Sequence, residues 1–260
     1  MSYALISYDK ISSTNTLAKQ LALLPGAVTV ISAKEQTSGR GRQGKSWDSA
    51  KGLGLWISIV LEPELELSNL PTLTFVVANA VASLLRKTFQ LPAEIKWPND
   101  VFVGDKKICG ILSETYRATN GSKGSSGRRR VILGVGLNVA HRPQDFAEGL
   151  QATSINFELL QRDLASKITK PEKVLPLLME FFEQEYAVYV AESAIDGESK
   201  TILNHWIAMN RTIGSSVEFT LDGLRKVGTA VGITPEGHLL INTGEGSFVK
   251  VSSGEVTHLT

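Results

Sequence analysis

The sequence predicts an α+β fold built from two units, and its hydrophobic pattern supports this in three ways. Short apolar segments typical of strands are interspersed with amphipathic helical segments as far as residue 210. After Arg211, short strand-like segments separated by glycine turns indicate a small β-barrel. The chain has 260 residues, enough for one large domain and one small domain. We therefore expect a domain of residues 1–210 and a second of residues 211–260.

In the first unit, the pattern predicts strands at 3–8, 27–33, 53–61, 94–97, 101–103, 106–114 and 131–139, and helices at 16–24, 70–89, 171–193 and 199–209. The segment 53–61 is apolar on both faces, so it should be a central strand of a covered sheet. Pro98-Asn99-Asp100 and Gly104-Asp105 are turn sequences, which predicts antiparallel pairing of the strands that they join.

The remaining segments are predicted from the same signals. The second unit should contain strands at 217–221, 224–233, 238–242 and 247–251. Residues 119–130 are rich in glycine and serine and then basic, which predicts an exposed loop between two paired strands. We interpret its Arg128-Arg129-Arg130 run as a solvated loop edge.

Composition excludes several classes of protein. Hydrophobic residues make up 42% and charged residues 20% of the chain, and the net charge is +1, so nothing global attracts nucleic acid or a membrane. A single cysteine, Cys109, permits no intramolecular disulfide. The first residues lack the pattern of a signal peptide, and no apolar run could span a bilayer. We expect a cytoplasmic protein.

A basic, glycine-rich segment runs from Gln36 to Trp47 and lies between two predicted strands. Gly39, Gly41 and Gly44 alternate with Arg40, Arg42 and Lys45. Glycine leaves backbone amides uncovered, and guanidinium groups match carboxylate and phosphate oxygens. The segment is therefore a solvated basic loop, an arginine-glycine segment that contacts nucleic acid, or an anion-binding loop that closes over a ligand. Its position between two strands favours the anion-binding loop.

Three further clusters contain candidate binding residues. Ser13, Thr14 and Asn15 precede a helical pattern, where they either cap the helix or present polar groups to a ligand. The segment 96–107 offers Lys96, Asn99, Asp100 and Lys107. Gly134 and Gly136 lie within a predicted buried strand, which indicates a bulge or the close approach of a ligand. His141, His205, His238 and His258 are far apart in sequence, so we predict no metal site made of protein side chains.

Taken in order, these segments resemble the biotin protein ligase family. The resemblance rests on Ser13-Thr14-Asn15, Gln36 with Gly39-Arg40-Gly41-Arg42-Gln43-Gly44 and Trp47, Lys96-Trp97-Pro98-Asn99-Asp100, Lys107 with Gly110, and Gly134-Val135-Gly136-Leu137-Asn138. It implies a mixed sheet with packed helices, similar to class II synthetases, followed by a small β-barrel. It also implies a ligase that makes biotinyl-5'-AMP from biotin and ATP with Mg²⁺, and then transfers biotin to a lysine of a biotin carboxyl carrier protein.

The resemblance also implies roles for the matching residues. Biotin would be bound by Ser13, Thr14, Asn15, Gln36, Gly39, Arg40, Lys107, Gly110, Gly134 and Gly136; ATP and the adenylate would be bound by Arg40, Arg42, Trp47, Lys96, Asn99, Lys107 and Asn138. Lys107, Arg42 and Arg40 would be the catalytic cations. Asp100 would orient or deprotonate the carrier lysine, or else be an exposed turn residue.

The sequence departs from the family pattern at two places. Repressor members of the family have an N-terminal helix-turn-helix domain, whereas here the catalytic pattern begins within the first fifteen residues, so we expect no DNA binding. Gln43 stands where the family loop often has arginine. A homodimer is possible.

Three competing functions remain open from the sequence. A lipoate or octanoate ligase of related fold would need an apolar tunnel for an acyl chain. A nucleic-acid-binding module would show a larger positive excess and stacking aromatics on the barrel. A biotin-binding protein without catalysis would not require so many anion contacts, such as Lys107 and Arg42.

Overall fold

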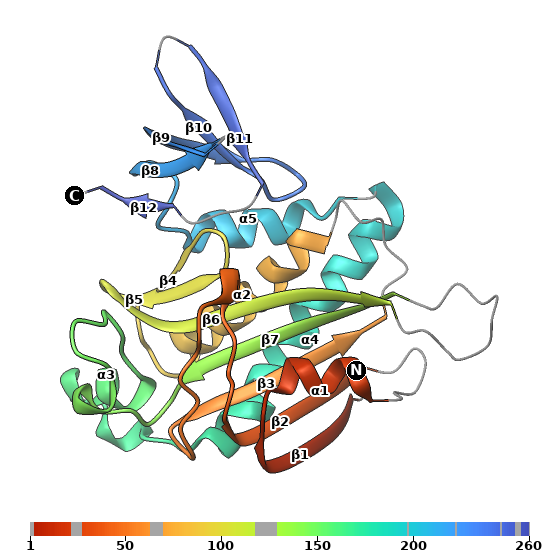
Figure 1. Ribbon diagram of the computed structural model, residues 1–260, viewed down its shortest axis with the longest axis vertical. Helices are drawn as coiled ribbons and strands as arrows, with labels where there is room; N and C mark the ends of the chain where they lie inside the picture. Colours follow the sequence, from red (N-terminus) through yellow and green to blue (C-terminus); the bar gives the residue numbers. More distant parts are fainter. Residues whose placement is uncertain are drawn as a thin grey trace, which may run out of the picture.

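The computed structural model describes residues 3–21, 28–62, 70–117, 129–196, 198–221, 223–244, 246–252 and 256–259. It confirms the predicted fold class, because helices pack on a mixed seven-stranded sheet and a separate five-stranded antiparallel sheet follows (Figure 1). Among the described helices, none has both the length and the apolar composition needed to cross a membrane.

The large sheet has the strand order β1-β2-β3-β7-β6-β5-β4. Its strands are β1 (Tyr3–Ile11), β2 (Val28–Gln36), β3 (Gly54–Leu61), β4 (Ala93–Lys96), β5 (Asp100–Val103), β6 (Lys106–Arg117) and β7 (Arg129–Asn138). Strands β1 and β2 are parallel, and the other neighbours are antiparallel, including the predicted β4–β5 and β5–β6 pairs. All eight residues of β3 are buried, as expected for a central strand.

The two faces of this sheet are covered unequally. The long helices α2 (Leu70–Lys87) and α4 (Pro171–Asp196) lie behind the sheet in Figure 1 and form the main core with it, and α5 (Lys200–Met209) packs against α2. Among the described helices, the short helix α1 (Thr14–Gln20) lies on the opposite face, where its Ala18 packs with Ile31, Val60 and Ile132 in a small apolar cluster.

The small sheet has the order β11-β10-β9-β8-β12. Its strands are β8 (Ser216–Leu221), β9 (Leu224–Ile233), β10 (Leu239–Asn242), β11 (Phe248–Val251) and β12 (Thr257–His258). Buried Trp97 ties it to the large unit, because its indole N–H donates to the Gly237 carbonyl at 3.0 Å and its backbone N–H donates to Thr212 Oγ1 at 3.0 Å.

The sequence did not predict the helix α3 (Ile155–Gln161) or the 3₁₀ turns η1 (Arg42–Gly44), η3 (Pro143–Asp145) and η4 (Ala165–Lys167). These elements are too short to show a clear period. Helix α3 begins at a Ser154 cap, whose hydroxyl accepts from the Phe157 N–H at 3.3 Å. The cap is the one local signal that could have identified the helix.

The prediction of a solvated Arg128–Arg130 run is wrong for Arg130. Its side chain is only 8% exposed, and its Nε lies 2.8 Å from Glu62 Oε1, also 8% exposed. Its Nη1 donates to the Leu21 carbonyl at 3.0 Å. A buried arginine is stable where its donors are satisfied, which the sequence around 130 does not reveal. Residues 118–128, most of the predicted loop, lie outside the described residues.

We predict that Arg130→Met lowers the free energy of unfolding by about 3 kcal/mol, because it removes the cation beside a buried carboxylate. Urea denaturation measures the change. The control is Arg86→Met on the exposed part of α2, which should shift stability by less than about 0.5 kcal/mol. Equal changes in the free energy of unfolding would contradict a stabilising role for the buried Arg130–Glu62 ion pair.

Candidate active site

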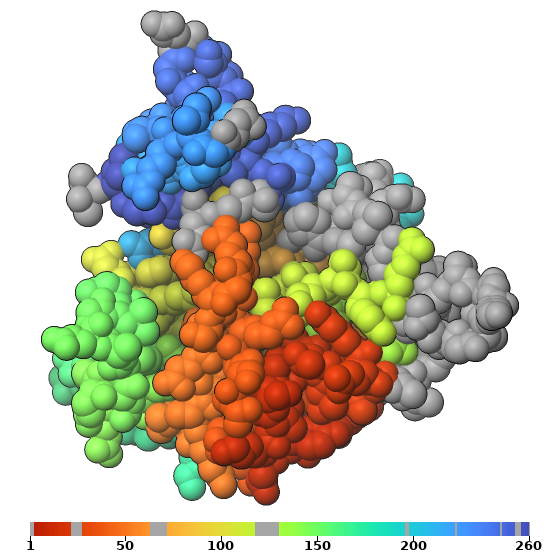
Figure 2. Space-filling model, viewed as in Figure 1, coloured from red at the N-terminus to blue at the C-terminus, as the bar shows by residue number. Residues whose placement is uncertain are grey.

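A cavity of about 470 Å³ opens on the sheet face that carries α1. Its walls come from the start of α1, the loop after β2, the turn between β4 and β5, the glycine-containing parts of β6 and β7, and residues 146–152. Val256 and Thr257, at the start of β12, also line the cavity. In Figure 2 the loop after β2 (orange) runs over the front of the molecule toward the small blue sheet.

Almost all of the predicted site residues line this one cavity. They are Ser13, Thr14, Asn15, Gln36, Arg40, Arg42, Trp47, Lys96, Asn99, Asp100, Lys107, Gly110, Gly134, Gly136 and Asn138. Gly39 does not line it. Residues separated by more than 120 positions are thus brought together by the order of the strands.

One end of the cavity is neutral and rich in hydrogen bonds. Gln36 Oε1 accepts from the Thr14 backbone N–H at 2.8 Å and from the Thr14 hydroxyl at 3.1 Å, and Gln36 Nε2 donates to Ser49 Oγ at 2.8 Å. The hydroxyl of buried Ser58 lies 2.7 Å from Thr14 Oγ1 and 2.5 Å from Asn15 Oδ1. The capping interpretation of the 13–15 segment is confirmed, since Ser13 caps α1. All three residues also line the cavity, and their contact with a ligand stays a prediction.

The strand glycines clear space for other side chains. A Cβ on Gly134 would lie 2.4 Å from Asn15 Oδ1, and a Cβ on Gly136 would lie 2.4 Å from Trp47 Nε1. Gly110, directly opposite Gly136 in the sheet, would place a Cβ 2.8 Å from the Trp47 ring. Real Cβ atoms do not approach so closely, so the Trp47 indole can lie against the sheet only because Gly110 and Gly136 have no side chains.

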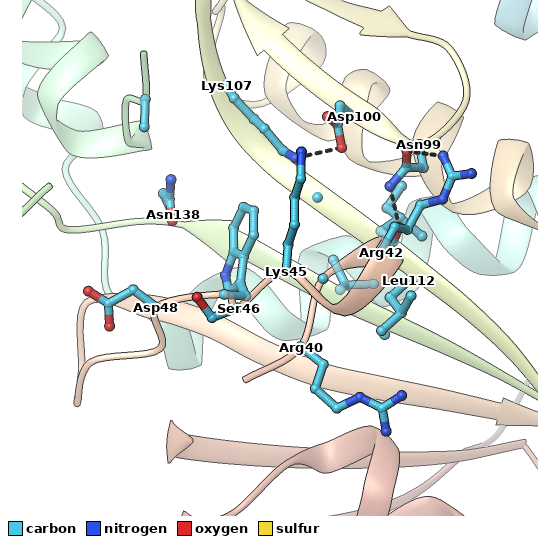
Figure 3. A pocket seen from close by; sticks show the side chains of 18 of the residues that line it. Arg40, Arg42, Lys45, Ser46, Asp48, Asn99, Asp100, Lys107, Leu112 and Asn138 are labelled. Carbon is cyan, nitrogen blue, oxygen red and sulfur yellow. Dashed lines mark hydrogen bonds and ion pairs between the residues drawn. The ribbon is translucent and has the colours of Figure 1, made fainter. Parts of the chain in front are cut away.

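The other end of the cavity is cationic. Lys107 Nζ lies 2.7 Å from Asp100 Oδ1 and 5.2 Å from the centre of the Trp47 ring. Figure 3 shows this ion pair, with the Lys45 side chain pointing toward the same carboxylate. The Lys107 backbone is held on a second side, because its N–H donates to the Gln151 carbonyl and its carbonyl accepts from the Thr153 N–H. Lys107 is thus held at both ends, by the backbone hydrogen bonds and by the ion pair of its ammonium group.

The two loop arginines point in different directions (Figure 3). Arg42 Nη1 donates to Asn99 Oδ1 at 3.0 Å, and Asn99 Nδ2 donates in turn to the Ile111 carbonyl at 2.7 Å. Arg40 instead bonds Glu114 Oε1 at 2.8 Å, on the side of α1. The loop is therefore attached to the sheet at two separate places.

Gly39 acts within the loop and not at the cavity surface. Its carbonyl accepts from the Trp47 N–H at 2.9 Å, and a Cβ on it would lie 2.2 Å from the Trp47 carbonyl oxygen. The two strands of the loop approach too closely there for any side chain. At the tip, Gln43 adopts a φ of 54°, in the left-handed region that residues other than glycine rarely occupy.

Two predicted residues face the cavity while contacting the protein elsewhere. The Lys96 ammonium lies 5.7 Å from the centre of the Phe102 ring. Asn138 Nδ2 donates to the Thr153 carbonyl at 3.0 Å, which joins the end of β7 to the segment that holds Lys107. Asn138 thus supports the Lys107 backbone, whatever else it contacts.

Sequence reasoning missed several residues of the site. Ser58 and Glu114 are polar positions within strands, and only their place next to α1 makes them notable. The cavity is also lined by residues from segments without a motif, namely His141, Phe146, Ala147, Leu150, Gln151, Ala152, Val256 and Thr257. Burial lowers the pKa of His141, which stacks on Phe146.

The structure also shows which reactive groups the site contains. Cys109 is fully buried, and burial raises the pKa of its thiol, so it is a core residue and not a nucleophile. Within the described ranges, no group of three or more His, Cys, Asp or Glu side chains is arranged to hold a metal ion. The site is a polar and cationic pocket under a glycine-rich loop, which fits an enzyme that binds two anionic substrates.

Comparison with known proteins identifies the family. Residues 8–130 match the Biotin/lipoate A/B protein ligase family, and residues 212–259 match the Biotin protein ligase C terminal domain. The chain is 33% identical over 258 residues to the Bifunctional ligase/repressor BirA of Bacillus subtilis, covering 98% of this chain and 74% of that protein. It is 31% identical to the Biotin--[acetyl-CoA-carboxylase] ligase of Paracoccus denitrificans, covering 91% of this chain and 93% of that protein.

Structural comparison agrees. The biotin protein ligase of Aquifex aeolicus in complex with biotin and ATP superimposes with a TM-score of 0.77 at 27% identity, over 98% of both chains. The fold and site thus define a ligase of the biotin and lipoate ligase class. The sequence relationships show that the chain belongs to the biotin protein ligase family.

The contacts of the loop glycines predict a sharp difference between neighbours. Gly39→Ala should loosen the loop, because the added methyl group meets a backbone oxygen at 2.2 Å. In the protein alone, we expect at least a fivefold faster tryptic cleavage after Arg40, Arg42 or Lys45. Gly41→Ala is the control, because its Cβ would lie an ordinary 3.4 Å from the Lys45 carbonyl oxygen. Equal cleavage rates in the two variants would contradict the contact at Gly39.

Proposed function

We propose that this biotin protein ligase carries out both steps of biotin attachment in the cavity described above. In the first step a biotin carboxylate oxygen attacks the α-phosphorus of ATP, and pyrophosphate leaves. In the second, a carrier lysine attacks the acyl carbon, AMP leaves, and the nitrogen loses a proton. The observation that supports the proposal is that one cavity joins a neutral polar end to a cationic end.

The neutral end suits the uncharged ureido ring of biotin. That ring carries both N–H donors and a carbonyl acceptor, and it needs partners of both kinds. Thr14, Asn15 and Gln36 supply hydroxyl and amide groups without charge, held by the network around Ser58. We assign Ser13 to the same group because it lines the cavity beside them.

The cationic end suits the reaction centre, where two anions must meet. Charge repulsion and positioning form the main barrier, so fixed cations are the expected catalysts. Lys107 is a compact charge with a fixed backbone and can contact the carboxylate and the α-phosphate together. Arg42 and Arg40 lie on the loop, where they can take phosphate oxygens as the loop closes and excludes water from the anhydride.

ATP would occupy the part of the cavity next to Trp47, Lys96, Asn99 and Asn138. The flat indole suits an adenine ring. Mg²⁺, which neutralises phosphate charge when bound, would be held mainly by phosphate oxygens and water, since the described residues form no acidic cluster for it.

Further proposals concern partners. The acceptor is a biotin carboxyl carrier protein of the acetyl-CoA carboxylase type, as the name of the Paracoccus relative indicates for that enzyme. We also propose that the protein works in the cytoplasm. A homodimer would be formed most simply through β1, an edge strand of the large sheet.

A lipoate or octanoate ligase is the second candidate, because the family matched over residues 8–130 includes lipoate ligases. The match of residues 212–259 to the biotin-specific C-terminal domain favours biotin. Substrate preference in one assay separates the two.

We predict that pyrophosphate release with Mg-ATP depends on biotin and not on lipoate or octanoate. Lys107→Gln should reduce it at least a hundredfold, because the mutant lacks the fixed charge between the two anions. Lys106→Gln, at the exposed neighbouring position, is the control and should retain activity within twofold. Release that depends on lipoate, or a Lys107→Gln enzyme with full activity, would refute the proposal.

Asp100 is assigned to orientation, because its carboxylate is joined to Lys107. If it holds Lys107, Asp100→Asn should slow adenylate formation about tenfold and leave transfer from preformed adenylate nearly unchanged. If it deprotonates the carrier lysine, transfer should slow instead. Single-turnover measurements of the two steps distinguish these results, and a normal transfer rate in Asp100→Asn excludes the base role.

A further inference from the structure

Glu114 on β6 contacts both helix α1 and the glycine-rich loop, which are separate parts of the predicted site. Its side chain is 16% exposed, and both carboxylate oxygens are occupied. Oε1 lies 2.8 Å from Lys19 Nζ and 2.8 Å from Arg40 Nη2, and Oε2 accepts from Asn15 Nδ2 at 2.9 Å. Asn15 and Lys19 are four residues apart on α1, so they present one helix face to this carboxylate.

The partners of Glu114 differ in how firmly they are held. Asn15 is 3% exposed and bonded on both ends of its amide, so it is fixed. The Arg40 side chain is 46% exposed, and an ion pair of that kind contributes roughly 0.2–1 kcal/mol. Glu114 therefore links a fixed group at the neutral end of the cavity to a group on the loop that can be drawn away.

The charge of Glu114 also sets the direction of the hydrogen bonds at the neutral end. A carboxylate can only accept, so the Asn15 amide must turn its NH₂ toward Glu114 and its oxygen toward Ser58. The Ser58 hydroxyl next to Asn15 Oδ1 in turn neighbours Thr14, whose hydroxyl donates to Gln36. Burial raises the pKa of the Glu114 carboxyl, but hydrogen bonds from Lys19 and Asn15 outweigh it and leave the pKa below its ordinary value.

We propose that Glu114 is a positioning residue that couples the neutral end of the cavity to the loop through Asn15 and Arg40. This inference rests on the proposed function, since it assigns the two coupled ends to biotin and to ATP. Asn15 already holds the Glu114 carboxylate without a ligand, and biotin bonded to Asn15 adds a further restraint on this contact. Glu114 in turn holds Arg40 through Nη2 while the other guanidinium N–H groups meet phosphate, which lowers the cost of ordering the loop around ATP. By thermodynamic linkage, ATP raises the affinity for biotin by the same factor.

Calorimetry on the intact protein tests the coupling. The dissociation constant of biotin is measured alone and with a saturating non-hydrolysable ATP analogue, and the ratio of the two constants gives the coupling factor. We expect Glu114→Gln to reduce this factor at least fivefold, with Glu114→Asp between the two. Lys19→Gln removes the other cation without touching the loop, and it should keep the factor within twofold of the unaltered protein.

A double-mutant cycle completes the test. Arg40→Gln should lose the coupling as Glu114→Gln does, and the double variant should lose no more, because both substitutions break one link. Additive losses, an unchanged factor in Glu114→Gln, or an equal loss in Lys19→Gln would overturn the inference. Urea denaturation checks folding, and if Glu114→Gln does not fold, the reduced factor expected in Glu114→Asp against the retained factor in Lys19→Gln decides, because Arg40→Gln also removes a proposed phosphate contact.

Failure of this inference can be distinguished from failure of the proposed function. An unaltered protein that does not bind biotin, or that binds it without releasing pyrophosphate, contradicts the function. A protein that binds biotin and releases pyrophosphate, but whose coupling factor does not change in Glu114→Gln or Arg40→Gln, contradicts only the role of Glu114.

Discussion

The active site depends on the absence of side chains where β6 and β7 cross the middle of the cavity floor. Gly110 and Gly136 are directly opposite each other, and Gly134 lies two residues further along the same face. Trp47 rests on the first two, and Asn15 reaches over the third. Any larger residue would push the loop away from the sheet and displace the helix residues that form the polar end.

Around this floor, the chain arranges charge in an order that suits the proposed reaction. Neutral groups from α1 and β2 lie at one end, and Lys107, Arg42 and Asn99 lie at the other. The backbone contacts of Lys107 with residues 151–153 keep the charge in place before substrates arrive. Such preorganised cations are effective in a cavity because they need not reorient during the reaction. In the proposed reaction, the loop adds the cations of Arg40 and Arg42 as it closes.

Much of this could be predicted from the sequence, because strand periodicity and turn residues report on local structure. The strands from β1 to β11 and the helices α2, α4 and α5 follow directly from these signals, and the motif residues point to the cavity. What could not be predicted depends on contacts distant in sequence. Glu114, Ser58 and Arg130 gain their roles only when strands and α1 are brought together, and α3 is too short to show a period.

The most direct test of the central claim is to isolate the intermediate. The purified protein is incubated with biotin and Mg-ATP without a carrier, and the bound small molecules are identified by mass spectrometry. The account predicts about one equivalent of biotinyl-5'-AMP per chain, which disappears when a carrier domain is added without further ATP, as biotin appears on its lysine. Biotin and ATP bound without adenylate, or an adenylate that the carrier does not consume, would contradict it.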